Sequence, residues 1–358
     1  MTSDIDNIIR PEIAGLKPYV SPSYEWRVKL DLNESPFDVP PEVKREIWKR
    51  VKRLQWQRYH DEFERPLVEK LADYENHDPD GVLIGNGSNE LIFHSLLSVI
   101  RHGDTVLFPE PTFSLYRQNI TVLGGQPESV MLNEADFSLN PDKLLAKAGA
   151  AGARAIVLCS PNNPTANLIP NEDIERVCRE FGGLVLVDEA YTQFADGDAF
   201  ELLERCQNLA ILRTFSKAFG LAGLRFGYLL ARPELAREID KVQLPHHVSF
   251  FTQLAASTLI ENAAVMKQRV ESLKRERDSL IGRLDCIAGV SPLPSQSNFI
   301  LIECTAVAAR ELFERLLARG VLIRNVSNYT GLARYLRITV GTPEENRVLI
   351  RALEEVLA

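Results

Sequence analysis

The amino-acid sequence predicts an α/β protein with a mainly parallel central sheet covered by helices on both faces, together with a smaller α+β region. Short β-branched runs alternate with amphipathic stretches from residue 82 onward, as in a parallel sheet with crossover helices. After Pro245 the pattern changes to a long helical run followed by a shorter series of strands and helices. A chain of 358 residues also suggests two domains, at roughly 150 residues for each.

The elements of the larger region follow in chain order. A helix is expected over residues 40–54. Its apolar residues are spaced three and four apart and form one stripe: Val43, Ile47, Val51 and Leu54. Strands are expected over residues 82–85, 105–108, 129–132, 154–159, 184–190, 208–215 and 224–231. Helices over residues 89–100, 114–123 and 171–181 would cover the sheet that these strands form.

The smaller region begins with a long helical run over residues 250–284, which has room for one break. The remaining pattern is strand 297–303, helix 309–320, strands 321–324 and 335–341, and helix 343–357. We therefore expect three parts. They are an N-terminal arm over 1–36 that belongs to the small domain or to a dimer contact, a large domain over 37–245 and a small domain over 246–358. No regular element is predicted within the arm.

Charge and composition exclude several classes of function. The chain has 41 Lys and Arg against 49 Asp and Glu, a net charge of −8 without a basic cluster, so no nucleic-acid partner is expected. No run approaches the roughly 18 consecutive apolar residues of a membrane span, and the first residues lack the apolar core of a signal peptide. The five cysteines are far apart, which is typical of free thiols in a reducing cytoplasm. None of the six histidines has metal-ligand spacing, so no metal is expected.

Two charged residues follow neighbouring strands of the predicted sheet. Asp188 ends one apolar run and Lys217 lies just past another. Ligands of open α/β sheets bind beyond the carboxyl ends of the strands, so we expect both residues in one crevice. A buried carboxylate requires a partner, and small neighbours would desolvate the lysine and lower its pKa towards nucleophilic use. Each residue also has a simpler interpretation when it is taken alone: Asp188 could cap a helix, and Lys217 could be a solvated surface residue.

Two polar loops also follow strands. In GNGSNEL (85–91), Gly85 and Gly87 would let backbone amides approach an anion at the start of a helix. A dinucleotide site of an NAD-dependent dehydrogenase is an alternative of a different class, but Glu90 stands where its third glycine belongs. A plain tight turn remains open both for this loop and for SPNNPT (160–165).

Together, a lysine nucleophile, a buried acid and an anion cradle are what pyridoxal phosphate needs. The chain resembles the fold type I aminotransferases of classes I and II, and among them the histidinol-phosphate aminotransferases. The resemblance runs from about Leu16 to the C-terminus. It rests on the motifs LKPY, LDLNESP, QRYH, GNGSNEL, EPTF, SPNNPT, VDEAY, RTFSKAFGLAGLRFG and YLRITVGT, in this order.

The resemblance implies a set of roles around the cofactor ring. Lys217 would carry pyridoxal phosphate and move protons between the substrate's Cα and the C4′ atom. Asp188 would pair with the pyridine nitrogen. Tyr191 and Asn163 would hydrogen-bond the phenolic oxygen, and Phe113 would stack on the ring.

Further roles concern the anionic groups. The resemblance implies a site for the cofactor phosphate, made by Ser88, Asn89, Ser216 and Arg225. It implies a homodimer with a shared active site, in which Tyr59 reaches the phosphate bound by the neighbouring subunit. The substrate pocket would be lined by Tyr19, Asn33, Arg324 and Arg337, with Arg337 anchoring the anionic group of the substrate.

The expected reaction is amino transfer from histidinol phosphate to 2-oxoglutarate, a step of histidine biosynthesis. Aromatic amino-acid aminotransferases and threonine-phosphate decarboxylases share the same cofactor residues and remain alternatives. The chain departs from the usual family pattern at Ala166, where glycine is common, and at Phe113, where tyrosine is common. QRYH and NESP replace RYP and NENP, and these changes affect the substrate assignment more than the cofactor assignment.

Overall fold

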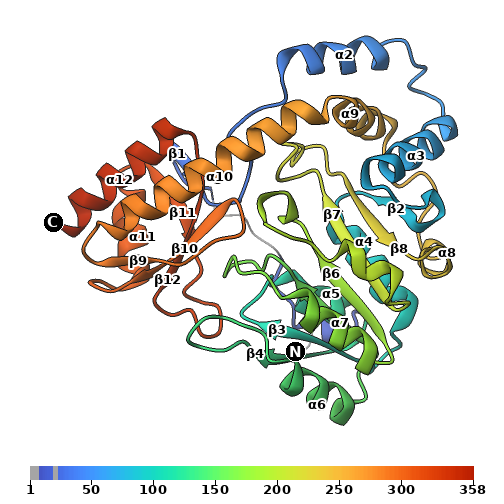
Figure 1. Cartoon of the computed structure of the whole chain (residues 1–358), viewed down its shortest axis with the longest axis horizontal. Coiled ribbons are helices and arrows are strands. Elements are labelled where there is room, and N and C mark those ends of the chain that lie inside the picture. The colour runs from blue at the N-terminus through green and yellow to red at the C-terminus, as the bar shows by residue number, and fades with distance from the viewer. Residues whose placement is uncertain (1–7, 19–22) are drawn as a thin grey trace.

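The computed structural model describes residues 8–18 and 23–358 and contains two sheets (Figure 1). The larger sheet has the strand order β2-β8-β7-β6-β5-β3-β4, and only β8 runs antiparallel to its neighbours. Its strands are β2 (Val82–Gly85), β3 (Thr105–Glu110), β4 (Gln126–Met131), β5 (Ala155–Cys159), β6 (Leu184–Asp188), β7 (Leu209–Thr214) and β8 (Gly227–Ala231). The mainly parallel α/β sheet predicted from the sequence is confirmed.

Helices cover both faces of this sheet because successive strand residues point to opposite sides. Val157 and Cys159 belong to an apolar cluster with one set of helices, whereas Ile156 and Leu158 belong to the cluster on the other face. The first set is α4 (Ser88–Val99), α5 (Leu115–Val122) and α8 (Pro233–Asp240). The second set includes α3 (Glu64–Glu75), α6 (Pro141–Ala151) and α7 (Asn171–Glu180).

The smaller sheet has the order β1-β11-β12-β10-β9 and lies at one side of the molecule in Figure 1. Its strands are β1 (Val28–Leu30), β9 (Val290–Pro292), β10 (Phe299–Cys304), β11 (Val321–Asn325) and β12 (Tyr335–Thr339), with helices α11 (Ala309–Leu317) and α12 (Pro343–Leu357). Strand β1 was not predicted, since three residues carry no periodic signal. It forms by pairing in parallel with the distant β11.

The long helical run is broken once, as expected, into α9 (Phe250–Glu261) and α10 (Ala263–Asp285). Asn262 makes the break, and its side chain donates to the carbonyl of Thr258 at 2.9 Å, which ends α9. Helix α9 packs against α3 and α2 (Pro41–Val51), and α10 extends from there to the smaller sheet (Figure 1). The domain limits at 36/37 and 245/246 stay a prediction.

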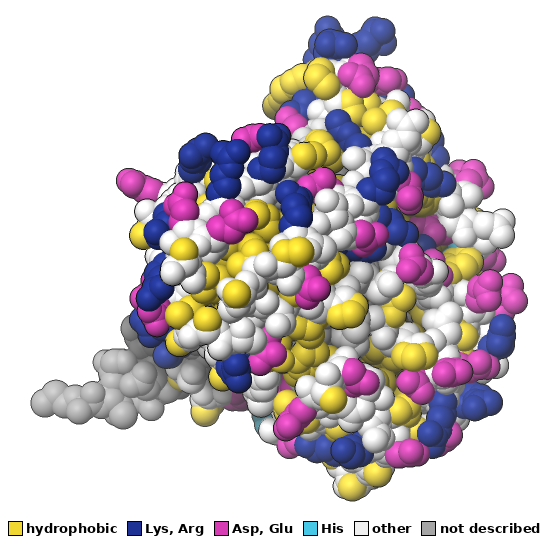
Figure 2. Space-filling model, turned by 60° about the vertical axis from the view of Figure 1, so that its left-hand side comes forward, with side chains coloured by type: hydrophobic (Ala, Val, Ile, Leu, Met, Phe, Trp, Pro, Cys, Tyr) yellow, Lys and Arg dark blue, Asp and Glu magenta, His cyan; other side chains and the backbone are white. Residues whose placement is uncertain are grey.

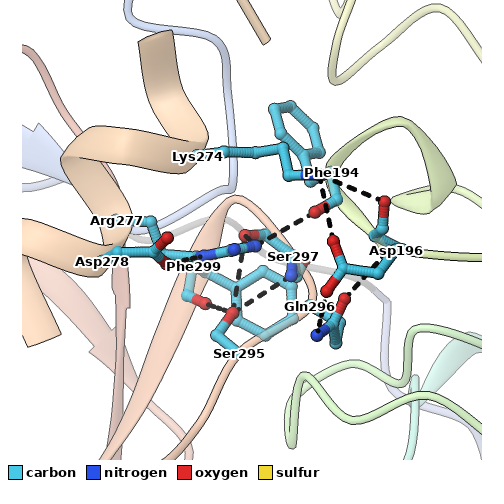
Figure 3. Close-up of polar contacts among 10 residues, drawn as sticks. Phe194, Asp196, Lys274, Arg277, Asp278, Ser295, Gln296, Ser297 and Phe299 are labelled. Carbon is cyan, nitrogen blue, oxygen red and sulfur yellow. Dashed lines mark hydrogen bonds and ion pairs between the residues drawn. The ribbon is translucent and has the colours of Figure 1, made fainter. Parts of the chain in front are cut away.

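A buried arginine of α10 joins the two sheets (Figure 3). Arg277 donates to the carbonyl of Phe194, which follows β6, at 3.0 Å and to that of Ser297, which precedes β10, at 3.3 Å. Gln296 and Lys274 bind the carboxylate of Asp196 at 3.0 and 3.2 Å. These bonds hold the smaller sheet close to the carboxyl ends of the larger one, where the site lies.

The remaining elements are short. They are α1 (Pro11–Ala14) and the 3₁₀ turns Asp61–Phe63, Pro79–Gly81, Thr192–Phe194 and Phe200–Glu204. Within the described ranges, no helix combines the length and apolar character needed to cross a membrane. On the face drawn in Figure 2, cationic and anionic side chains are interspersed.

Candidate active site

A cavity of about 610 Å³ lies where β5, β6 and β7 of the larger sheet end and β11 and β12 approach. In-register pairing aligns Cys159 with Asp188 and Asp188 with Leu212, so these strands end nearly together. Most residues predicted for the site line this cavity: Asn33, Ser88, Asn89, Phe113, Asn163, Asp188, Tyr191, Ser216, Lys217, Arg225, Arg324 and Arg337. The prediction that Asp188 and Lys217 share one crevice is therefore confirmed.

Lys217 follows β7 and presents its amine to the cavity. Its Nζ donates to the carbonyl of Leu32 at 2.8 Å. Burial lowers the pKa of Lys217 to about 7, and the positive charges of Arg337 and Arg225 act in the same direction. A large fraction of the lysine is therefore neutral at physiological pH, which is the nucleophilic form.

Asp188 ends β6 on the face of the sheet that α5 covers. Its Oδ2 accepts a hydrogen bond from the hydroxyl of Tyr116 at 2.7 Å, and its Oδ1 accepts one from the Ala190 N–H at 3.1 Å. Burial raises the pKa of Asp188, while these two donors and the charge of Lys217 favour the ionised form. The carboxylate can accept a further hydrogen bond from a group in the cavity.

A buried hydrogen-bond network fixes Tyr191 at the wall of the cavity. The Tyr191 hydroxyl accepts from Asn33 Nδ2 at 3.0 Å and from Asn163 Nδ2 at 3.3 Å. Arg337 Nη1 donates to Asn163 Oδ1 at 2.5 Å. Burial raises the pKa of Tyr191, so its hydroxyl keeps its proton and can donate into the cavity.

Two arginines face each other across neighbouring strands of the smaller sheet. Arg324 of β11 is paired with Arg337 of β12, and both line the cavity. Desolvation lowers the pKa of Arg337, and the charge of Arg324 adds to this effect. Like charges directly opposite one another on paired strands are unfavourable. In addition, the Nε of Arg337 is buried without a hydrogen-bond partner. Both observations point to a place for an anion.

A cradle for a second anion forms at the N-terminus of α4. Gly87 caps this helix with φ +86°, and Ser88 and Asn89 begin it at the cavity wall. Arg225 Nη1 donates to Ser216 Oγ at 3.1 Å, which holds the guanidinium beside the helix start. Helix N-termini favour anions because their amides are unpaired and the macrodipole is positive there.

The structure also shows the local roles of three residues at which the sequence departs from a motif: Glu90, Ala166 and Phe113. Glu90 Oε2 accepts from the Asn86 N–H at 2.7 Å and closes the loop in which a dinucleotide motif would have a glycine. Ala166 adopts φ +64°, a left-handed conformation that explains why glycine is common at this position. Phe113 lies at the cavity wall and packs edge-on against Tyr116, with ring centroids 5.5 Å apart.

Among the described residues predicted for the site, Tyr59 does not line this cavity. Tyr59 is 78% exposed and stacks on His246 at a centroid distance of 4.3 Å. Tyr19 lies outside the described residues. Sequence reasoning also missed Tyr116 and Tyr329. Tyr116 lies inside an amphipathic helix, where the only signal is that a buried hydroxyl needs a partner, and Tyr329 lines the cavity from a loop.

The family model "Aminotransferase class I and II" matches residues 27–353. The chain is 38% identical over 354 residues to a protein of Caldanaerobacter subterraneus subsp. tengcongensis named "Histidinol-phosphate aminotransferase", covering 99% of this chain and 100% of that protein. A protein of Chlorobium phaeovibrioides with the same name is 37% identical over 355 residues, covering 99% and 98%. These matches contradict the dehydrogenase alternative.

Solved structures have the same fold. The histidinol-phosphate aminotransferase of Sinorhizobium meliloti, in complex with pyridoxal-5'-phosphate, superposes with a TM-score of 0.87 at 26% identity and covers 98% of this chain and 97% of its own. The enzyme of the same name from Clostridium acetobutylicum gives a TM-score of 0.84 at 23% identity, covering 92% and 98%.

Proposed function

The chain belongs to the class I and II aminotransferases, and on this premise we propose that it uses pyridoxal phosphate to transfer the amino group of histidinol phosphate to 2-oxoglutarate. The products would be imidazole acetol phosphate and glutamate. The observation that carries the choice of donor is the pair Arg324 and Arg337, two opposed cations at the cavity wall with an unpaired buried N–H.

The residues of the cavity fit pyridoxal phosphate. The amine of Lys217 is largely neutral and can react with the aldehyde of this cofactor. The buried carboxylate of Asp188, bound only by neutral donors, matches the protonated ring nitrogen in charge. The helix N-terminus beside Arg225 matches the phosphate in charge. The lack of a Cβ at Gly87 leaves the room that the Arg225 guanidinium fills. The proposed phosphate ligands are Ser88, Asn89, Ser216 and Arg225.

When bound, pyridoxal phosphate supplies an electron-withdrawing ring that makes the Cα–H bond of the amino donor acidic. Asp188 would keep a proton on the ring nitrogen by electrostatic attraction. Tyr191 and Asn163 would donate hydrogen bonds to the phenolic oxygen, and Phe113 would pack on the ring. Lys217 would carry the cofactor and then, as a free amine, take up the proton released from Cα.

The amino donor would lie between the lysine and the two arginines. A phosphate carries close to two negative charges at neutral pH and offers three acceptor oxygens, so it can satisfy both guanidiniums. A single carboxylate compensates the opposed charges less fully. Asn33 would line the proposed substrate pocket, and its backbone is fixed there because its N–H donates to Thr339 Oγ1 at 2.9 Å and its carbonyl accepts from Asn298 Nδ2 at 3.0 Å. Tyr19 would complete the pocket.

A panel of amino donors in single half-reactions tests this proposal. Purified enzyme loaded with pyridoxal phosphate is mixed with histidinol phosphate, histidinol, histidine, phenylalanine, tyrosine or threonine phosphate. The visible absorbance of the cofactor is followed. Histidinol phosphate should react fastest, and histidinol much more slowly, because charged hydrogen bonds contribute roughly 1.5–3 kcal/mol each.

Other outcomes would change the assignment. Equal use of histidinol and histidinol phosphate would contradict a phosphate site and favour an aromatic amino-acid aminotransferase. Release of CO₂ from threonine phosphate would favour the decarboxylase alternative. Failure of the purified protein to bind pyridoxal phosphate would contradict the proposed cofactor itself.

We also propose that the enzyme is a homodimer with a shared active site. Trp48, Trp56 and Tyr59 are 56%, 62% and 78% exposed and lie on one stretch of chain. Trp48 and Trp56 pack edge-on against Phe251 and Phe250 of α9. Apolar, aromatic surfaces of this kind are typical of permanent subunit interfaces. The Tyr59 hydroxyl would then reach the phosphate bound by the partner subunit.

The proposed location is the cytoplasm. The five cysteines are free thiols, and Cys159, Cys178, Cys206 and Cys304 are buried. Free thiols are usual in the reducing cytoplasm, where disulfides are rare. The proposed partners of the enzyme are its small-molecule substrates and a second copy of the chain.

A further inference from the structure

We propose that Tyr116 is a positioning residue that keeps Asp188 ionised and correctly oriented towards the ring nitrogen of the bound cofactor. This inference rests on the proposed function, because it presumes that the cavity takes pyridoxal phosphate. Tyr116 itself does not line the cavity. It would act through Asp188 from the first turn of α5.

The geometry of the pair is specific. Tyr116 is fully buried, with 0% of the residue exposed. Its hydroxyl donates to Asp188 Oδ2 at 2.7 Å, while Oδ1 is held by the backbone N–H of Ala190 at 3.1 Å. One donor on each oxygen prevents rotation of the carboxyl group. Each oxygen keeps a lone pair, and Asp188 remains part of the cavity wall.

The chemical type of the donor matters. A buried carboxylate needs hydrogen bonds to stay ionised. A lysine or arginine in the place of Tyr116 would neutralise the charge of Asp188 and weaken its attraction for a protonated ring nitrogen. A phenol stabilises the carboxylate without cancelling its charge. Burial and the charge of Asp188 raise the pKa of Tyr116, so the phenol stays a donor.

The groups that surround the Asp188 carboxylate differ in charge, and Tyr116 is the neutral side chain from α5 that donates a hydrogen bond to it. Lys217, on the loop after β7, favours the ionised form of Asp188 by its positive charge. On β5, Cys159 faces the same carboxylate and phenol, and burial raises the pKa of its thiol, so it stays neutral. The Tyr116 ring also supports Phe113 edge-on at 5.5 Å, which ties the proposed ring-stacking residue to the same helix.

The test compares Tyr116→Phe with the matched control Tyr74→Phe. Both changes remove one hydroxyl from a tyrosine that packs edge-on against a phenylalanine, but Tyr74 contacts Phe219 away from the cavity. Two readouts apart from turnover are measured: the affinity of the cofactor-free protein for pyridoxal phosphate and the pH midpoint of the visible absorbance of the bound cofactor.

Tyr116→Phe should weaken cofactor binding about tenfold, since a hydrogen bond to a charged group is lost. It should also raise the absorbance midpoint by about one pH unit. A less ionised Asp188 leaves the ring nitrogen less protonated, and the loss of that positive charge makes the nitrogen linked to Lys217 easier to protonate. Tyr74→Phe should leave both values unchanged.

A double variant separates positioning from packing. If Tyr116 acts through Asp188, Tyr116→Phe should have almost no further effect on either readout in the Asp188→Asn background. Should Tyr116→Phe alone fail to fold while the double variant folds, the unpaired carboxylate is the cause and the coupling is supported. Equal effects of Tyr116→Phe in both backgrounds, or an unchanged midpoint and affinity, would overturn the inference. If wild type binds no pyridoxal phosphate, the proposed function fails instead.

Discussion

Gly87 and Arg225 occupy adjoining space at the start of α4. A Cβ at position 87 would lie 2.5 Å from Arg225 Nη2, and the backbone there has φ +86°. The left-handed backbone conformation therefore favours glycine, and a side chain at this position would push the Arg225 guanidinium aside. On the other side of the same loop, a Cβ at Gly227 would lie 2.4 Å from the Ser88 nitrogen. Two glycines from motifs far apart in the sequence thus shape one anion cradle.

The first prediction concerns this cradle. Gly87→Ala should displace Arg225 and strain the helix cap, and so weaken pyridoxal phosphate binding by roughly tenfold or more, since a charged hydrogen bond is worth about 1.5–3 kcal/mol. Titration of the cofactor-free protein with pyridoxal phosphate measures the change. Gly149→Ala is the control, because Gly149 lies in α6 with no atom within 4 Å of an added Cβ. Equal affinities for the two variants would contradict the role of the contact.

A second prediction concerns Lys217. Borohydride reduction of the loaded enzyme followed by peptide mapping should find the pyridoxyl group on this lysine. Because its pKa is lowered to about 7, the neutral amine dominates above that pH. The rate at which the cofactor-free protein captures pyridoxal phosphate should rise with pH through about 7 and then level off. A label on another lysine would remove Lys217 from its proposed role.

Asp188 gives a third prediction, with opposite effects on activity and stability. Asp188→Asn should lower turnover about 100-fold or more, the size of effect seen when a preorganised electrostatic partner is removed. Burial raises the pKa of Asp188 above its ordinary value of 3.8, so above that pH the folded state binds more protons at this group than the unfolded state does. The contribution of Asp188 to the free energy of unfolding therefore falls as the pH rises from 3.8 through the raised pKa. The Tm of the cofactor-free variant at pH 7 should therefore be no lower than that of wild type. Near-normal turnover would exclude Asp188 from the mechanism.

The fourth prediction addresses the donor pocket. Arg337→Gln should reduce kcat/KM for histidinol phosphate roughly 10- to 100-fold, as expected for losing one charged hydrogen bond or more, and leave the low rate with histidinol nearly unchanged. Arg334→Gln is the control, since Arg334 directly precedes β12, its side chain is 61% exposed and it pairs with Glu303. If Arg337→Gln impairs both donors equally, the arginine does not bind the phosphate.

The fifth prediction concerns Tyr59. Lys217→Ala and Tyr59→Ala should each have low activity alone but recover part of it when mixed and re-associated. In half of the sites of the mixed dimer, an intact Lys217 would meet an intact Tyr59 from the partner subunit. Sedimentation at working concentration should give the mass of a dimer. A monomer, or no gain of activity on mixing, would show that Tyr59 does not act across an interface.

Local sequence patterns determined the architecture and much of the site. Alternating strands and helices predicted the parallel sheet, and the positions of Asp188 and Lys217 after their strands predicted the shared cavity. These inferences hold because strand ends are set by local hydrophobicity, and parallel strands bring their carboxyl ends to one edge. Strand boundaries were less exact. Strand β8 starts at Gly227, and not at residue 224, since Arg225 adopts φ +55° in the preceding turn.

Tertiary structure alone decided which distant groups meet. Strand β1 exists because β11 offers it a partner, and the opposed pair Arg324 and Arg337 exists because β11 and β12 align them. The bond from Tyr116 to Asp188 likewise joins α5 to the end of β6. Periodicity reports which face of an element is buried, but it contains no information on which polar atom another element places within hydrogen-bond distance.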